Sequence, residues 1–426
     1  MKGVIIAAPR SGSGKTMITL GLLRALRDRK IDVHSAKSGP DYIDPQFHAA
    51  ASGAACVNLD AWAMPPRQLR ATASAQGGEL LIVEGAMGLF DGAPDEDPMG
   101  KGSVADLAAI LDLPIVLVLE ASQQAQTAAV LVAGLANYRK DVRVAGVILN
   151  RVGSARHVDI LTRAIATTGI PVLGAVPRST DMETPSRHLG LVQPGERPDL
   201  VAFINKAAAL VADHIDLDQL TALAGEVKSA DAPPHLAPLG QRIAVAKDEA
   251  FGFAYPHILN DWQRAGAEVM TFSPLANEAP DRSADAIYLP GGYPELHARD
   301  LTVNGDFRTG MVAARDAGAL IYGECGGYMV LGDTLTDGEG VIYPMLGFLP
   351  VSTSFENPKL HLGYRHLTPE SILPWGPIKG HEFHYAMATK SAPGKLYAAA
   401  GSQGNPLPDM GHINGRVCGS FAHIIA

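Results

Sequence analysis

The sequence predicts an α/β fold in two successive domains, and three observations carry this prediction. The chain has 426 residues, which is more than one ordinary hydrophobic core accommodates. Short apolar runs, typical of buried strands, alternate with segments of helical periodicity. The alternation breaks at the proline-rich residues 232–240 and then resumes. We therefore expect one domain over residues 1–237 and a second over residues 238–426.

Each domain is expected to contain a parallel sheet, because helical segments separate its apolar runs. In the first domain the clearest strands are expected at residues 4–7, 80–83, 115–119, 144–149 and 172–174. In the second domain they are expected at residues 243–246, 286–289 and 319–322. We expect the alternation of strands and helices to continue from there to the C-terminus.

Composition and charge argue against several classes of protein. A net charge of −9 does not suit a surface that binds nucleic acid. The strongest apolar run, residues 113–119, stops at Glu120 and is too short to span a membrane. The chain opens on a strand-like run, so no signal peptide is expected. Its three cysteines, Cys56, Cys325 and Cys418, lack metal-like spacing, which favours a reducing cytoplasm.

The segment APRSGSGKT, residues 8–16, has the pattern of a phosphate-binding loop. It follows an apolar run and leads into a segment of helical periodicity. Glycines let backbone N–H groups close on phosphate oxygens, a lysine contacts the outer phosphates and a threonine hydroxyl holds Mg²⁺. The alternative is an ordinary glycine-rich turn, and Pro9 replaces the usual first glycine. We expect nucleotide binding by Gly12, Ser13, Gly14, Lys15 and Thr16.

Three acidic clusters follow expected strands, at the sheet edge where ligands of open α/β sheets collect. They are residues 37–45 (KSGPDYIDP), 83–92 (VEGAMGLFDG) and 102–108 (GSVADLA). Glu84 stands where an acid would hold nucleotide-bound Mg²⁺. Clusters beside a phosphate loop favour metal and substrate binding, although Ser103 suits a helix cap equally well.

Asn150 ends another expected strand. Its side-chain amide would suit the edge of an adenine base, and a turn-forming asparagine is nearly as good an interpretation. We count Asn150 among the expected nucleotide-binding residues.

The segment YGECGGYM, residues 322–329, places a cysteine between an expected strand and an expected helix. Glycines follow Cys325, as the sharp turn of a nucleophile elbow requires, and a helix N-terminus favours the thiolate. A buried structural cysteine is the alternative, and the surrounding glycines favour catalysis over it. Upstream, in LPGGYPE, backbone N–H groups of Gly291 and Gly292 would form an oxyanion hole.

A nucleophilic cysteine needs a base, and two regions could supply it. They are residues 380–385 (GHEFHY) and residues 419–425 (GSFAHII). Local chemistry does not choose between them, since either could be adjacent to the cysteine in space. For His412, a histidine satisfied within the core is an open alternative.

Taken together and in this order, the motifs resemble one protein family. They are the phosphate loop, KSGPDYIDPQFH, VEGAMGLFDG, PSRHLGLV, LPGGYPE, YGECGGYM, GHEFHY and the terminal SFAHII. Over essentially its whole length the chain resembles the cobyrinic and hydrogenobyrinic acid a,c-diamide synthases of cobalamin biosynthesis. In that family a dethiobiotin-synthetase-like P-loop ATPase domain is fused to a class I (triad) glutamine amidotransferase domain.

The resemblance implies a role for each candidate residue. Cys325 would be the nucleophile, His423 the residue that activates it, and His384 a part of the glutamine site. Mg²⁺ would be held by Thr16, Asp41 and Glu84. Phosphate or substrate would be contacted by Lys37, Asp41, Tyr42, Asp44, Asp91 and Ser103.

The implied reaction is amidation of the a- and c-acetate carboxylates of hydrogenobyrinate through an acyl phosphate. ATP and L-glutamine would be co-substrates and a corrinoid the partner, with no nucleic acid and no membrane, in the cytoplasm. Whether the chain forms a homodimer is left open. The same reaction on cobyrinate or on nickel-sirohydrochlorin is the nearest alternative, and a regulatory P-loop ATPase is a remote one.

Two departures from the family pattern bear on the substrate. Ser186 stands where a glutamate is expected before RHLGLV, which leaves substrate contacts there undefined. After His423 the chain lacks the second histidine of a His-x-His pair, which favours the hydrogenobyrinate branch of the family.

Overall fold

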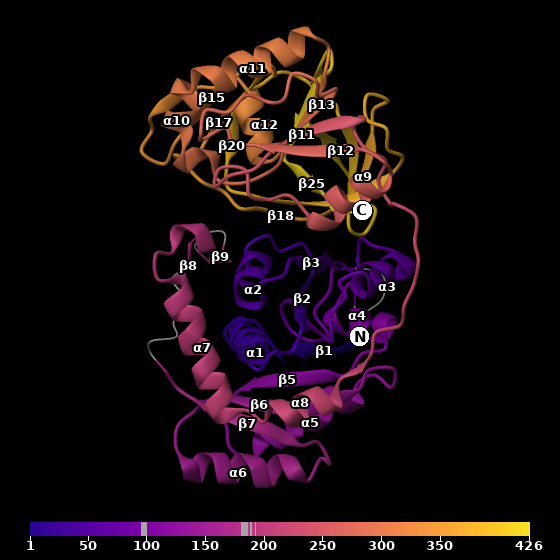
Figure 1. The fold of residues 1–426 in the computed structure, drawn as a ribbon, viewed down its shortest axis with the longest axis vertical. Helices are drawn as coiled ribbons and strands as arrows, with labels where there is room; N and C mark the ends of the chain where they lie inside the picture. The colour runs from indigo at the N-terminus through magenta and orange to yellow at the C-terminus, as the bar shows by residue number, and fades with distance from the viewer. Residues whose placement is uncertain (95–99, 180–185, 188–189, 192) are drawn as a thin grey trace. The chain divides into compact units, whose positions relative to one another are not determined.

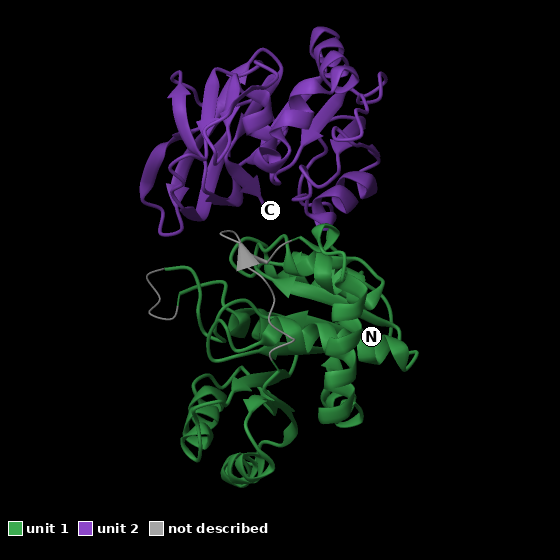
Figure 2. Cartoon of the chain, turned by 90° about the vertical axis from the view of Figure 1, so that its left-hand side faces the viewer, with its two compact units in different colours: residues 1–232 green, residues 233–426 purple. Residues whose placement is uncertain are grey.

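The computed structural model describes residues 1–94, 100–179, 186–187, 190–191 and 193–426. The chain divides into two compact units, Met1–Ala232 and Pro233–Ala426 (Figure 2). The division falls within the proline-rich residues 232–240. Across the described residues, no helix is both long and apolar enough to cross a membrane.

Unit 1 is built on a sheet whose main path is parallel, in the order β3-β2-β4-β1-β5-β6-β7 (Figure 1). Its strands are β1 (Lys2–Ala7), β2 (Val33–Ser38), β3 (Cys56–Leu59), β4 (Leu80–Glu84), β5 (Ile115–Glu120), β6 (Val144–Val152), β7 (Val172–Pro177) and β10 (Gly225–Glu226), which pairs antiparallel with β1. A separate pair is formed by β8 (Ser186–Arg187) and β9 (Gly190–Leu191). The five expected strands are confirmed.

Strands β2 and β3 are not among the clearest expected strands, because their sequences VHSAKS and CVNL mix polar residues into buried strands. Those polar side chains include Lys37, which is 4% exposed. This buried lysine near the end of β2 interrupts the apolar pattern, and it lines the cavity that is described below.

Helices cover the sheet of unit 1. They are α1 (Lys15–Asp28), α2 (Asp44–Ser52), α3 (Pro66–Ser74), α4 (Val104–Leu111), α5 (Thr127–Asn137), α6 (Ala155–Ala166), α7 (Leu200–His214) and α8 (Leu217–Leu223), with a 3₁₀ turn η2 (Pro194–Glu196). Helix α1 packs against α7 (Figure 1). A Cβ on Gly21 would lie 2.5 Å from the carbonyl oxygen of Ala207, so glycine is needed for this close approach.

Unit 2 contains a six-stranded sheet in the order β12-β11-β13-β14-β24-β23, parallel except for β23. Its strands are β11 (Arg242–Ala246), β12 (Glu268–Phe272), β13 (Ala286–Leu289), β14 (Leu320–Glu324), β23 (His412–Asn414) and β24 (Val417–Ser420). Its helices are α9 (Pro256–Arg264), α10 (Ala298–Val303), α11 (Gly305–Asp316) and α12 (Gly326–Leu331), with a 3₁₀ turn η3 (Pro294–Leu296). The three expected strands are confirmed as β11, β13 and β14.

The expected alternation to the C-terminus is wrong. Beyond α12, which ends at Leu331, every element of the described chain is a strand. Strands β23 and β24 complete the six-stranded sheet, and the others form a mixed four-stranded sheet and an antiparallel five-stranded sheet. These strands are β15 (Thr334–Thr336), β16 (Ile342–Pro344), β17 (Val351–Ser354), β18 (His361–Pro369), β19 (Ile378–His384), β20 (Met387–Ser391), β21 (Tyr397–Gly401), β22 (Pro406–Met410) and β25 (Ala422–Ile424). Recurrent prolines and glycines in this part of the chain prevent long helices and leave short antiparallel pairings.

Candidate functional site

The glycine-rich loop connects β1 to α1 in unit 1. Gly12 and Gly14 have φ angles of 76° and 88°, a left-handed conformation that side chains rarely adopt. The hydroxyl of Ser13 donates to the carbonyl of Arg10 at 2.9 Å and closes the turn. The loop therefore ends with its backbone at the N-terminus of α1, where phosphate oxygens are favoured.

Asn150 lies against this loop. Its Nδ2 donates to the carbonyl of Ser13 at 2.9 Å, and a Cβ on Gly14 would lie 2.2 Å from the same Nδ2. Its Oδ1 accepts from the backbone N–H of Arg151 at 3.0 Å. Asn150 thus supports the loop, a contact that the sequence did not indicate, and its contact with adenine stays a prediction.

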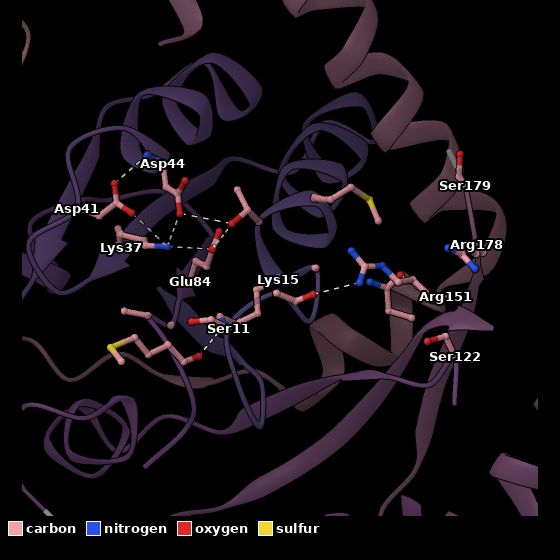
Figure 3. Close-up of a pocket in the computed structure, with 18 of the residues that line it drawn as sticks. Ser11, Lys15, Lys37, Asp41, Asp44, Glu84, Ser122, Arg151, Arg178 and Ser179 are labelled. Carbon is pink, nitrogen blue, oxygen red and sulfur yellow. Dashed lines mark hydrogen bonds and ion pairs between the residues drawn. The ribbon is translucent and has the colours of Figure 1, made fainter. Parts of the chain in front are cut away.

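A cavity of about 760 Å³ opens beside the loop (Figure 3). A volume of this size suits a nucleotide-sized ligand. Nine of the expected site residues line it: Gly12, Gly14, Lys15, Thr16, Lys37, Asp41, Asp44, Glu84 and Asn150. Arg151 and Arg178, which were not expected from the sequence, also line the cavity. Arg151 lies near the end of β6 and Arg178 directly follows β7, where ligand-binding residues of parallel sheets are found.

Lys15 lies at the start of α1 and is 7% exposed. Its Nζ donates to the carbonyl of Met87 at 2.6 Å, and Met87 has a φ angle of 50°. Burial lowers the pKa of Lys15 to about 8, and the nearby Glu84 opposes this shift. Among the described residues, the carbonyl of Met87 is the hydrogen-bond partner of this ammonium, and a phosphate oxygen in its place would be an anionic partner.

Lys37, Asp44 and Glu84 form an ion cluster (Figure 3). Thr16 is hydrogen-bonded to this cluster. Nζ of Lys37 lies 2.5 Å from Oδ2 of Asp44 and 2.9 Å from Oε1 of Glu84. The hydroxyl of Thr16 donates to the same Oε1 at 2.7 Å. Burial alone would lower the pKa of Lys37, but the two carboxylates raise it well above its ordinary value.

The two carboxylates of the cluster differ in their ionisation. Burial and the nearby Asp41 raise the pKa of Asp44 to about 6, against the opposing effect of Lys37. Burial also disfavours the charge of Glu84, but Lys37 and His48 outweigh it and hold the pKa of Glu84 below its ordinary value. Glu84 is therefore the firmly ionised acid of the cluster.

His48 is a residue that the sequence analysis missed. It lies on α2, fully buried, with Nε2 2.7 Å from Oε2 of Glu84 and Nδ1 3.7 Å from Sγ of Cys56. Burial would lower the pKa of His48, but the carboxylate of Glu84 raises it to about 10. The spacing of Asp44 and His48, four residues apart on one helix, is the signal that could have identified it.

The donor atoms near Thr16 suit a hard cation. The hydroxyl of Thr16 and the carboxylates of Asp44 and Glu84 offer the oxygen ligands that Mg²⁺ prefers. Oδ1 of Asp41 accepts from the backbone N–H groups of Ile43 and Asp44 at 2.8 and 3.1 Å, so one of its oxygens serves the turn before α2. The contact of Asp41 with Mg²⁺ stays a prediction.

The structure gives Asp91 and Ser103 local contacts. Oδ2 of Asp91 accepts from the N–H of Gly88 at 2.8 Å. Ser103 is the N-cap of α4 in a reciprocal capping box with Asp106, so the structure favours the cap over the substrate contact.

Tyr42 lies half-buried next to Asp41. His188 and Leu189, beyond Ser186, lie outside the described residues, and the side chain of Ser186 is not described.

In unit 2, Cys325 lies in a sharp turn between β14 and α12. It has a φ of 45° and a ψ of −104°, and it is the N-cap of the helix. Its N–H donates to the carbonyl of Ser420 at 2.8 Å. This strained strand–turn–helix conformation is that of a nucleophile elbow.

Gly291 lies between Cys325 and His423. A Cβ on Gly291 would lie 2.4 Å from Cε1 of His423 and 3.3 Å from Cβ of Cys325. A Cβ on Gly326 would lie 3.0 Å from the backbone nitrogen of Gly292. The thiol, the imidazole and the expected oxyanion loop are therefore gathered at one place.

The two regions that could supply the base are neighbouring strands. β19 pairs with β25, and His381 is directly opposite His423. Their rings stack with centroids 4.9 Å apart. The contact with Gly291 places His423 next to the thiol, while Nε2 of His381 lies 3.0 Å from the hydroxyl of Tyr255.

His384 lies on β19 and stacks on Phe421 with centroids 3.9 Å apart. Its Nε2 lies 3.0 Å from Oε1 of Glu382, whose other oxygen accepts two N–H groups from Arg365. The role of His384 in glutamine binding stays a prediction.

His412 lies in the core, with its Nδ1 2.6 Å from the hydroxyl of Tyr328. It is therefore a histidine satisfied within the core, which was the open alternative for this residue.

Burial keeps both partners of the Cys–His pair neutral. It raises the pKa of the Cys325 thiol, with a further contribution from Glu295, and the N–H of Gly326 opposes the shift. It lowers the pKa of His423 well below the ordinary value, with a contribution from His381. Formation of a thiolate therefore requires transfer of its proton to the imidazole as a coupled event.

Comparison with known proteins assigns each unit to a known domain family. Residues 4–192 match the model of the CobQ/CobB/MinD/ParA nucleotide binding domain, and residues 242–426 match that of the CobB/CobQ-like glutamine amidotransferase domain. The chain is 53% identical over 433 residues to the hydrogenobyrinate a,c-diamide synthase of Brucella anthropi, covering 100% of this chain and 98% of that protein. It is 51% identical over 429 residues to the protein of the same name from Rhizobium meliloti, covering 100% and 99%. The chain therefore belongs to the hydrogenobyrinate a,c-diamide synthase family.

Proposed function

We propose that this chain uses ATP and glutamine to amidate the a- and c-acetate carboxylates of hydrogenobyrinate. One observation supports this most directly: a phosphate-loop cavity and a Cys–His pair occur in separate units of one polypeptide. Amide formation needs both an activated acid and a nitrogen donor. The relatives that match the whole chain bear the name of this reaction.

In unit 1 the carboxylate would be activated as an acyl phosphate. Lys15 would leave the carbonyl of Met87 and contact the phosphate that is transferred. Mg²⁺, held by Thr16 with Glu84 and Asp44, would neutralise charge on the phosphates. Lys37 keeps these two carboxylates together, so the cluster is pre-organised before any ligand binds.

In unit 2 glutamine would be hydrolysed to supply ammonia. The thiol of Cys325 would attack the side-chain amide while its proton passes to His423. N–H groups in the Gly291–Gly292 turn would stabilise the oxyanion. Ammonia released in this way is unprotonated, whereas free ammonia at neutral pH is mostly protonated. The unprotonated ammonia would then attack the acyl phosphate.

Product analysis by mass spectrometry tests the substrate. Purified enzyme with ATP and glutamine is expected to convert hydrogenobyrinate to its diamide faster than it converts cobyrinate or nickel-sirohydrochlorin. A preference for either metal-containing ring would reject hydrogenobyrinate as the substrate. Cys325→Ala is expected to lose glutamine-driven amidation and keep ammonia-driven amidation, and Cys418→Ala serves as a buried-cysteine control.

We further propose that the enzyme works in the cytoplasm. Three free, buried cysteines agree with a reducing compartment. A homodimer is a second proposal, which light scattering on the purified chain would test. A regulatory ATPase is disfavoured, because such a switch has no use for the amidotransferase match over residues 242–426.

A further inference from the structure

A Cys–His pair works best when a third group orients the imidazole. The residues that follow His423 in the sequence are Ile424 and Ile425, whose apolar side chains cannot orient an imidazole. The structure brings another acid to the ring: Glu324, the residue before the nucleophile in sequence. The inference below rests on the proposed glutaminase chemistry of unit 2.

Glu324 is a buried carboxylate at the end of β14. It is 2% exposed. Its Oε2 accepts from the hydroxyl of Tyr288 and its Oε1 from the hydroxyl of Tyr322, both at 2.9 Å. Tyr288 is the partner of Tyr322 on the neighbouring strand, and their rings stack. Burial raises the pKa of Glu324 to about 7, and the two tyrosine donors oppose this shift because an ionised carboxylate only accepts hydrogen bonds.

The same carboxylate contacts the segment that carries the base. Oε1 of Glu324 accepts from the N–H of Ile424 at 3.3 Å. Oε2 lies 3.9 Å from Nδ1 of His423. Catalytic hydrogen bonds are often long in ligand-free enzymes and shorten when substrate binds. Glu324 therefore holds the main chain beside His423 and faces one nitrogen of its ring.

We propose that Glu324 is the positioning residue of the glutaminase site, which holds Nδ1–H of His423 and leaves Nε2 to accept the proton of Cys325. The Sγ–C bond then forms on the glutamine amide carbon, and the C–N bond breaks as Nε2 returns the proton to the departing ammonia. Water, deprotonated by the same Nε2, cleaves the thioester and gives glutamate. The charge of Glu324 stabilises the imidazolium that exists between these steps.

If Glu324 acted on the thiol by repulsion alone, its removal would shift the pKa of Cys325 in the direction opposite to the one that the proposal predicts. Glu295, Glu324 and Glu382 each raise the pKa of Cys325 by repulsion. Removing Glu324 would lower that pKa if repulsion were its only effect. If Glu324 stabilises the imidazolium, its removal raises the apparent pKa of the thiol. Among the described residues, the side chains of His381 and His384 also oppose a positive charge on His423.

The test compares full-length Glu324→Gln with wild type. We expect glutaminase kcat to fall about 100-fold, less than a well-aligned triad acid is worth. The KM for glutamine should stay within about twofold, because the carboxylate is not placed on the substrate. The pH profile of Cys325 alkylation by iodoacetamide, followed on its peptide by mass spectrometry, should move to higher pH. Glu295→Gln is the matched control and should move it to lower pH.

Unchanged kcat, or an alkylation profile that moves to lower pH in Glu324→Gln, would overturn the inference. Ammonia-driven amidation should be equal to wild type and reports that unit 1 is folded and active. If Glu324→Gln does not fold, Tyr288→Phe removes one donor to the same Oε2 and should give a smaller shift in the same direction, while no shift would count against the role. Absence of glutaminase activity in the wild type would instead reject the proposed function itself.

Discussion

The position that a methyl group on Gly291 would occupy lies 2.4 Å from Cε1 of His423. Real Cβ atoms do not approach other atoms so closely, so a side chain at residue 291 must displace the imidazole or the loop. The glycine thus has a chemical role in addition to its conformational one. It allows the expected oxyanion loop and the base to lie against the same thiol.

Gly291→Ala is therefore expected to reduce glutaminase kcat/KM by at least about 100-fold, because displacement of a catalytic group by about 1 Å has an effect of this size. Ammonia-driven amidation should be unaffected. Gly305→Ala is the matched control, since a Cβ there meets nothing within 4 Å. Steady-state glutaminase assays on both variants decide the point, and near-wild-type activity of Gly291→Ala would contradict the geometry.

Lys15→Ala is expected to lower the ATP-dependent amidation rate by about 10²–10³-fold, because one charge-stabilising donor at the transferred phosphate is lost. This rate is measured with ammonia as the nitrogen donor, so that unit 2 does not contribute. Lys206→Ala, an exposed lysine on α7, is the control. Wild-type turnover in Lys15→Ala would reject the phosphate-loop assignment.

Glu84→Gln should impair amidation and leave glutaminase activity intact. The substitution removes a charge that pairs with Lys37 and His48 and that we assign to Mg²⁺. The concentration of Mg²⁺ needed for half-maximal amidation should rise. If the Mg²⁺ dependence of Glu84→Gln matches that of wild type, the proposed ligand role is wrong.

The His48–Glu84 pair predicts a dependence of stability on pH. The pKa of His48 is raised in the folded chain, from an ordinary 6.5 to about 10, by Glu84 acting against burial. Its contribution is therefore complete below pH 6.5 and is lost as the pH rises towards 10. Urea unfolding should show a gap in stability between wild type and His48→Gln at pH 6 that narrows by pH 10. A gap of constant size would contradict the charged pair.

Much of the fold could be predicted from the sequence, because the apolar strands of the two parallel sheets stand out from their surroundings. Strands β2 and β3 stand out less clearly, since polar residues such as Lys37 interrupt their apolar pattern. The β-rich end of unit 2 was missed, because antiparallel pairing depends on partners far apart in sequence.

Some of the candidate residues could likewise be predicted from the sequence and others could not. Glycines with positive φ and the elbow cysteine could be predicted, because local geometry dictates them. The choice between two histidine-bearing regions could not be made from residue chemistry, since it depends on the pairing of β19 with β25. His48 and Glu324 act through tertiary contacts, which no local pattern specifies.

The central claim is that one unit releases nitrogen from an amide and the other fixes it on an activated carboxylate. Its most direct test is the mass of the product formed from hydrogenobyrinate, ATP and glutamine labelled with ¹⁵N in its side-chain amide, in the presence of unlabelled ammonium. We expect a diamide in which both new nitrogens are ¹⁵N. Glutamine hydrolysis without label in the product, or no diamide at all, would contradict the coupling of the two sites.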